Sequence, residues 1–183
     1  MPIAIGQAVE SDFHDPLGML SDCHRRIARF LETLINVAEQ ASGGALNEHQ
    51  HEALDTALKY FREAAPKHTA DEEDSLFPRL RIRAMATGKR FGLMTILHSD
   101  HVAVVSRHDA VDDLGRKWLS NGPLTNDEAQ RLLDLLRGLR ETYQEHIEIE
   151  ETKLFPFAAK ILTSRDLEEM GKEMAERRGL VAK

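Results

Sequence analysis

Apolar residues recur at alternating spacings of three and four along most of the chain, the pattern of helices that bury one face. Four long stretches carry it, and they are expected to be helical over about 16–40, 47–83, 93–119 and 125–162. A short fifth helix is expected over about 164–179. No useful length alternates between apolar and polar residues, so no strand is predicted. Because short connections make successive helices antiparallel, the sequence predicts an all-α fold: an up-down-up-down antiparallel four-helix bundle with an additional short C-terminal helix.

Most of these helices begin at a capping pattern. The 183 residues suffice for one ordinary domain, so a single domain is expected over 1–183, with the bundle over about 15–162. Breaks are expected at ASGG, ATGKRFG and SNGP. The first helix starts at an Asp-Pro pair, and the second, fourth and fifth start at a cap followed three residues later by a side chain that bonds back to it: Asp15 with Pro16, Asn47 with Gln50, Thr125 with Glu128, and Thr163 with Asp166.

Composition and charge narrow the classes of partner. Apolar residues make up 42% of the chain and no run approaches the ~18 residues of a membrane span, so a soluble protein is expected. The net charge of -7 argues against nucleic acid or anionic lipid as the main partner. No signal peptide is recognisable at the start, and the one cysteine cannot form an internal disulfide, so a cytoplasmic location is expected. A local group of arginines is expected to form a solvated helix end: Arg79, Arg81, Arg83 and Arg90.

Histidines and glutamates interrupt the apolar seams of all four long helices. The first and third seams each contain a histidine at the same level, His24 and His101. The second and fourth seams each contain a histidine followed four residues later by a glutamate, which places both side chains on one face. These pairs are His68 with Glu72 and His146 with Glu150.

The chain also contains an internal repeat. HTADEEDSLFP at 68–78 and HIEIEETKLFP at 146–156 share His, Glu, Glu, Leu, Phe and Pro at matching positions. LSDCH at 20–24 matches LHSDH at 97–101 at nearly the same offset. Each half of the chain is therefore expected to be a helical hairpin that carries a histidine and then an HxxxE motif.

The expected turns bring these six side chains to one layer of the bundle. In an antiparallel hairpin, residues equidistant from the turn lie side by side, and the turns lie midway between His24 and His68 and between His101 and His146. Unpaired buried carboxylates are costly, and no arginine or lysine occupies a nearby seam position. A cation is therefore expected to neutralise the two glutamates.

Imidazole with carboxylate is the ligand set of iron, manganese or zinc. Four histidines and two glutamates exceed what one tetrahedral zinc needs, so two metal ions fit better. If both glutamates bridge and each ion takes two histidines, each ion has four protein ligands. That arrangement leaves room for a bridging solvent and one open position.

These six residues, with EExxLFP beginning at the glutamate of each HxxxE pair and DPLxxL before the first histidine, resemble the hemerythrin-like (HHE cation-binding) family over roughly residues 14–157. The resemblance implies a four-helix bundle around a non-haem di-iron centre, two iron ions joined by an oxo or hydroxo bridge. It implies O2, NO or peroxide as small-molecule ligands, with roles in oxygen binding, oxygen or redox sensing, iron handling or stress response.

Two positions depart from the family's oxygen carriers. The carriers have a second histidine four residues after the third-helix ligand, where this chain has Val105. Their fourth-helix carboxylate is an aspartate five residues after its histidine, whereas Glu150 lies four residues after His146. Reversible oxygen carriage is therefore not expected. Because the sequence shows no second active-site constellation or partner domain, a binding or sensing module that takes up O2 or a related small ligand is the leading hypothesis. An enzyme that reduces peroxide or nitric oxide or repairs iron-sulfur clusters, and a structural zinc bundle, are the alternatives, and the sequence indicates no particular protein partner.

Several residues near the expected layer are given other interpretations. His98 lies off the central seam, with metal ligation as its alternative. His108 and Tyr143 are expected to be core residues, with support of a metal ligand as their alternative. Cys23 points away from the neighbouring histidine on a helix. The glutamates that directly follow the two seam glutamates, Glu73 and Glu151, are expected to be solvated, with a supporting role as the alternative.

Overall fold

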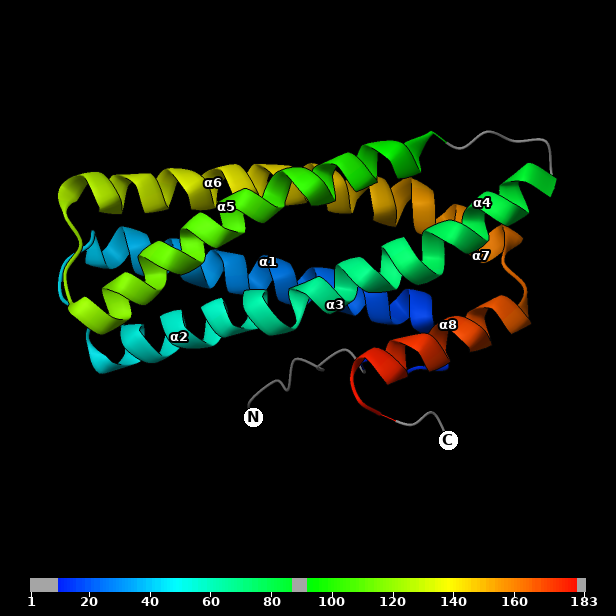
Figure 1. Ribbon diagram of the computed structural model, residues 1–183, viewed down its shortest axis with the longest axis horizontal. Coiled ribbons are helices and arrows are strands. Elements are labelled where there is room, and N and C mark those ends of the chain that lie inside the picture. The colour runs from blue at the N-terminus through cyan, green and yellow to red at the C-terminus, as the bar shows by residue number, and fades with distance from the viewer. Residues whose placement is uncertain (1–9, 87–91, 181–183) are drawn as a thin grey trace, which may run out of the picture.

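The structure is a computed structural model that describes residues 10–86 and 92–180, and every regular element in those ranges is helical. Four long helical columns lie side by side, and a shorter C-terminal helix packs against them (Figure 1). The elements are α1 (Pro16–Ala41), α2 (Glu48–Glu63), α3 (Ala65–Ala70), η1 (Asp71–Leu76), α4 (Phe77–Ala86), α5 (Leu93–Asn121), α6 (Asn126–Ile149), η2 (Glu150–Leu154), α7 (Phe155–Ile161) and α8 (Ser164–Arg177). The predicted helical bundle with an additional C-terminal helix is therefore confirmed.

The predicted capping contacts are present. The Asp15 carboxylate accepts a hydrogen bond from the Gly18 backbone, with Pro16 as the first helical residue. α1 ends at Ser42, whose φ of 47° lies in the left-handed region. The predicted break at ATGKRFG falls largely on residues 87–91, which lie outside the described ranges. Reciprocal capping boxes start α2, α6 and α8, at Asn47, Thr125 and Thr163.

The second column consists of α2, α3, η1 and α4, and the fourth consists of α6, η2 and α7. Both columns are less regular than the sequence predicts. The second column breaks at Ala64, and each column contains a short π-helical segment, η1 or η2. Each π-helical segment lies within one copy of the repeated motif, and a proline follows it at Pro78 or Pro156. Short π-helical turns inside α-helices are frequent at functional sites.

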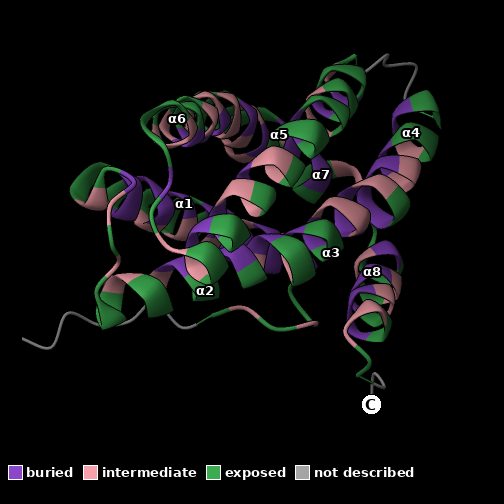
Figure 2. Cartoon of the chain, turned by 60° about the vertical axis from the view of Figure 1, so that its left-hand side comes forward, coloured by how far each residue is buried: buried purple, intermediate pink, exposed green. Residues whose placement is uncertain are grey.

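Two apolar clusters fill the bundle, one on each side of a polar layer. In Figure 2 the buried residues follow the sides of the helices that face one another. One cluster lies towards the α1–α2 and α5–α6 turns and includes Leu34, Leu58 and Trp118. The other joins α4, α5, α7 and α8 and includes Leu97 and Met170. On α1 the first cluster begins at Ile27 and the second ends at Leu20, and His24 lies between them. The predicted layer of histidine and glutamate side chains therefore lies between two hydrophobic clusters.

α8 is held to the second column by ion pairs. Arg79 lies 2.8 Å from Glu173, and Arg83 lies 2.9 Å from Asp166. The expectation of a solvated arginine cluster was therefore wrong for these two residues, because the apolar face of α8 brings its carboxylates beside them. Arg81 is exposed, and Arg90 lies outside the described residues.

None of the helices described within 10–86 and 92–180 is long and apolar enough to cross a lipid bilayer.

Candidate metal centre

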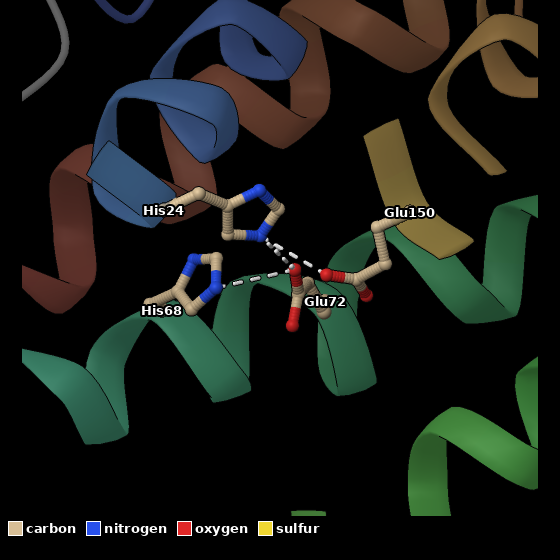
Figure 3. A group of neighbouring side chains, drawn as sticks. All are labelled: His24, His68, Glu72 and Glu150. Atoms are coloured by element: carbon tan, nitrogen blue, oxygen red, sulfur yellow. Dashed lines mark ion pairs between the residues drawn. The ribbon is translucent and has the colours of Figure 1, made fainter. Parts of the chain in front are cut away.

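All six side chains singled out in the sequence meet in one layer of the bundle. They form two groups, in each of which one nitrogen or oxygen atom per residue lies within 4.8 Å of the others. Figure 3 shows the first group, in which the His24 and His68 rings point towards the two carboxylates. The first group is His24, His68, Glu72 and Glu150, and the second is Glu72, His101, His146 and Glu150.

Both glutamates belong to both groups, and each directs its two oxygens to different histidines. Glu72 Oε1 lies 3.4 Å from His68 Nε2, whereas its Oε2 lies 3.2 Å from His101 Nε2. Glu150 Oε2 lies 3.0 Å from His24 Nε2, whereas its Oε1 lies 3.4 Å from His146 Nε2. Two ligand atoms each about 2.1 Å from one ion lie about 3 Å apart at right angles. These separations therefore suit a pair of ions joined by two carboxylates.

The carboxylate oxygens of the layer have no other partner. Glu72 and Glu150 are fully buried, and none of their four oxygens accepts a hydrogen bond from the described residues. The buried Nε2 of His24 is also without a hydrogen bond. Buried polar atoms are almost always paired, and a buried carboxylate without compensation is particularly costly. The donor set and the unsatisfied atoms together fit bound metal cations.

In the metal-free protein, protonated histidines compensate part of the negative charge of Glu72 and Glu150. Burial alone would lower the pKa of His24, but the nearby carboxylates of Glu150, Glu151 and Glu72 outweigh it and raise this pKa to about 11. The same balance raises the pKa of His101 to about 9, chiefly through Glu72. Burial alone would raise the pKa of Glu72, but the surrounding histidines hold it well below its usual range. Metal must therefore displace protons from these imidazoles.

A second pair of carboxylates holds the histidines from outside. Glu151 Oε1 lies 2.7 Å from His24 Nδ1, and Glu73 Oε1 lies 2.7 Å from His101 Nδ1. Because adjacent residues on a helix point about 100° apart, a glutamate that follows a buried one reaches a different helix. The expectation that Glu73 and Glu151 are solvated was therefore wrong. Their matching places in the repeat are the signal that predicts a shared role.

The outer carboxylates connect the two halves of the chain. Glu151 of the second half binds His24 and Ser21 of the first, with a distance of 3.0 Å to the Ser21 hydroxyl. Glu73 of the first half binds His101 and His98 of the second, with a distance of 3.0 Å to His98 Nδ1. His98 therefore occupies the place of Ser21 in the repeat. It contacts the outer carboxylate and belongs to neither group of candidate ligands.

The Nδ1 contacts of the other two histidines, His146 and His68, differ between the two halves of the repeat. His146 Nδ1 lies 3.3 Å from Asp100, but His68 Nδ1 is buried without a hydrogen-bond partner among the described residues. The position that matches Asp100 in the first half is Cys23, which is buried and belongs to neither group of candidate ligands. Burial raises the pKa of the Cys23 thiol. The two halves of the centre therefore differ in their outer contacts.

α8 braces the segment that carries Glu72. Asp71 is fully buried, and its two oxygens lie 2.9 Å from Arg177 and 2.7 Å from Arg178. Arg177 also donates to the Ser75 hydroxyl at 2.8 Å. These contacts fix the outer side of η1 while Glu72 points inward, so the C-terminal helix helps to position one of the shared carboxylates.

His108 and Tyr143 lie one step away from the layer. The His108 Nε2 and the Tyr143 hydroxyl are 2.8 Å apart, and neither side chain contacts a candidate ligand through a hydrogen bond. Burial lowers the pKa of His108 to about 4, so the imidazole is neutral and one of its two nitrogens can accept a hydrogen bond. Both residues are half-buried, so they lie at the edge of the core and not within it, and each is a hydrogen-bond partner of the other.

Removing an outer carboxylate is expected to weaken metal binding without abolishing the fold. In Glu151→Ala, the His24 ring loses its only Nδ1 partner within the described residues, so metal affinity should fall about 10-fold to 100-fold. Competition with a chelator of known affinity measures this change. Glu148→Ala, an exposed glutamate on α6, is the matched control and should bind metal as the unmodified chain does. Equal affinities for the two variants would contradict a supporting role for Glu151.

Comparison with known proteins agrees with this geometry. Residues 15–158 match the family model described as the hemerythrin HHE cation binding domain. A protein of Haemophilus influenzae described as uncharacterized is 27% identical over 166 residues, which cover 91% of each chain. The range matched by the family model includes all six side chains of the layer and ends before α8.

Proposed function

Because this chain belongs to the hemerythrin HHE cation-binding domain family, we propose that it is a non-haem di-iron protein that binds O2 or a related small ligand. Its role would lie in oxygen or redox sensing or in iron handling. The ligands to the two irons would be His24, His68, Glu72, His101, His146 and Glu150. Nitric oxide and peroxide are the related ligands, and we propose neither a nucleic-acid nor a membrane partner. A cytoplasmic location stays a prediction.

One observation carries the proposal: both buried glutamates offer one oxygen to each of two histidine pairs, and all four oxygens lack a hydrogen bond from the part of the chain that the structure describes. A single ion would leave half of this set without a partner. Nitrogen and oxygen ligands suit iron as well as manganese and zinc, and the resemblance of the ligand pattern to the hemerythrin-like family favours iron.

The protein residues would hold and orient the centre. A pair of iron ions supplies reversible one-electron redox chemistry and a place for a small ligand. Glu73 and Glu151 keep the Nδ1 protons of His101 and His24, so that each Nε2 faces the layer. The apolar clusters on both sides exclude bulk water from the carboxylates.

Val105 favours a second candidate, an oxidoreductase that handles nitric oxide or peroxide. This residue is 56% exposed, and with His101 it lines a cavity between α5 and the second column. A valine there supplies no nitrogen ligand, and His101 forms part of the cavity wall, so we infer that small molecules approach the centre from this cavity. Such access favours turnover over the protected binding that an oxygen carrier needs.

The reaction of the reduced protein with O2 tests these proposals. We expect air to oxidise the anaerobically reduced, iron-loaded protein to a stable form, because the cavity beside His101 would admit small molecules to the centre. The visible absorption spectrum should change on aeration and stay changed when the sample is purged with argon. Protein loaded with zinc is the control and should show no change.

Spectral changes that vanish on purging and return with air over many cycles would show a reversible carrier and contradict the sensor and oxidoreductase proposals. Repeated consumption of peroxide or nitric oxide by the iron-loaded protein, in the presence of a reductant, would favour the oxidoreductase. A single oxidation without turnover would favour the sensor.

A further inference from the structure

A cavity of about 430 Å³ lies between α5 and the α2–α3 part of the second column, beside the His101 half of the centre. Its walls are mainly apolar. Its volume lies within the range of about 300–1,000 Å³ that is typical of sites for organic ligands. A diatomic molecule needs far less, because an apolar cavity of about 150 Å³ already holds benzene. The second column contributes Leu58, Phe61 and Ala65, and α5 contributes Val104, Val105 and Val111.

The cavity also contains one neutral polar pair. Tyr143 and His108 line it and are joined by their 2.8 Å hydrogen bond, and the other ring nitrogen of His108 makes no hydrogen bond to any described residue. The matching positions in the other half of the repeat are Ala65 and Leu31, and Leu31 is only 2% exposed. The polar pair therefore belongs to this side of the bundle and is not part of the repeated core.

Charges at the cavity disfavour an anion. The Arg62 guanidinium is paired with Asp112 at 2.8 Å, and the same carboxylate is paired with Arg116 at 2.8 Å. The charged residues that line the cavity are Arg62, Asp109 and Asp112, which together carry one negative charge. Apolar walls with one neutral hydrogen-bonding pair and an acidic surround are complementary to an uncharged aromatic molecule that carries a hydroxyl group.

We propose that this cavity binds a small neutral hydroxylated aromatic molecule, of one or two rings, next to the metal centre. The rings lie against the valines of α5 and the Phe61 side, and the hydroxyl group exchanges hydrogen bonds with Tyr143 and His108. This binding does not depend on which metal the centre contains. It adds an organic ligand to the small diatomic ligands of the proposed function.

The test uses 2-naphthol as the probe and the full-length, metal-loaded chain. Calorimetric titration should show saturable binding with one probe per chain. The anion 2-naphthoate, which has the same rings with a carboxylate, should bind at least about tenfold more weakly because of the acidic surround. Naphthalene should bind roughly threefold to tenfold more weakly than 2-naphthol because it lacks the hydroxyl group.

Two exposed valines of α5 provide matched variants. Val105 lines the cavity and is 56% exposed, so Val105→Trp should fill it without disturbing the core and should weaken 2-naphthol binding at least about tenfold. Val102 is 62% exposed and does not line the cavity, so Val102→Trp should bind the probe as the unmodified chain does. Tyr143→Phe should reduce the difference between 2-naphthol and naphthalene.

Three results would overturn the proposal. The first is the absence of saturable 2-naphthol binding to the unmodified chain. The second is equal affinity in Val105→Trp and Val102→Trp, provided that circular dichroism shows both to be folded. The third is binding of 2-naphthoate as tightly as 2-naphthol, which would exclude a preference for neutral ligands.

Discussion

Replacing one shared glutamate is expected to remove both metal ions. In Glu72→Gln or Glu150→Gln the amide keeps the volume of the side chain but loses the charge and one of the two ligand oxygens. Because each glutamate faces both pairs of histidines, bound metal should fall from about two ions per chain to less than about one. Elemental analysis after reconstitution and desalting measures the stoichiometry.

Variants of the histidines distinguish a shared carboxylate from an ordinary ligand. His68→Ala or His146→Ala removes a ligand from one group only, so about one ion should remain. His101→Ala should likewise lose about one ion, whereas His98→Ala should retain most of the metal, because the His98 side chain is 57% exposed and its partner within the described ranges is Glu73. Glu63→Gln, an exposed change on α2, is the control for the glutamine variants. Retention of a full ion in Glu72→Gln would contradict the bridging arrangement.

Removing the metal is expected to lower the melting temperature markedly. The buried carboxylates then lose their cations, and a ligand present at 1,000 times its Kd stabilises the folded state by about 4 kcal/mol. For a chain of this size the corresponding shift is about 8–16 °C. Differential scanning calorimetry of metal-loaded and chelator-treated protein at pH 7 measures it. Equal melting temperatures would show that the carboxylates are otherwise compensated.

The melting temperature of the metal-free protein should also depend on pH. The folded-state pKa values of His24 and His101, about 11 and about 9, lie above the value of about 6.5 for an unfolded histidine. The stability from these protonated imidazoles is complete below about pH 6.5 and is lost as the pH rises through the folded values. The gap between metal-loaded and metal-free protein should therefore widen from pH 6.5 to pH 9. A constant gap over this range would contradict imidazolium compensation.

The positions of the six candidate ligands followed from simple periodicity. A histidine or glutamate stands out in a seam whose other residues are apolar and spaced by three and four. The internal repeat then indicates that these residues lie in one layer of the bundle. His24 between Leu20 and Ile27 is the plainest case, because both neighbours in the seam belong to the apolar clusters. Their proposed role as ligands still awaits measurement.

Other features depend on interactions that no local pattern displays. η1 and η2 differ from the α-helices around them by one extra residue in the turn, and no residue type in their sequences marks that insertion. The pairing of Asp71 with Arg177 and Arg178 joins residues more than 100 positions apart. It depends on how α8 folds back, and the same holds for the arginines expected to be solvated.

The role of the outer carboxylates, Glu73 and Glu151, could be predicted from the sequence only in part. Glu73 and Glu151 follow the shared glutamates directly, and an isolated reading of the helix places them on its solvent side. The neighbouring helix converts this side into a contact with His101 or His24. The signal in the sequence was that a glutamate occupies this position in both copies of the repeat. Two identical residues at matching positions indicate a shared role.

The most direct test of the di-iron centre is an anomalous difference map, recorded at the iron absorption edge, from crystals of the full chain reconstituted with iron. The account predicts two peaks, one between His24 and His68 and the other between His101 and His146, with Glu72 and Glu150 contacting both. A single peak, or peaks that appear only at the zinc edge after reconstitution with iron, would contradict it.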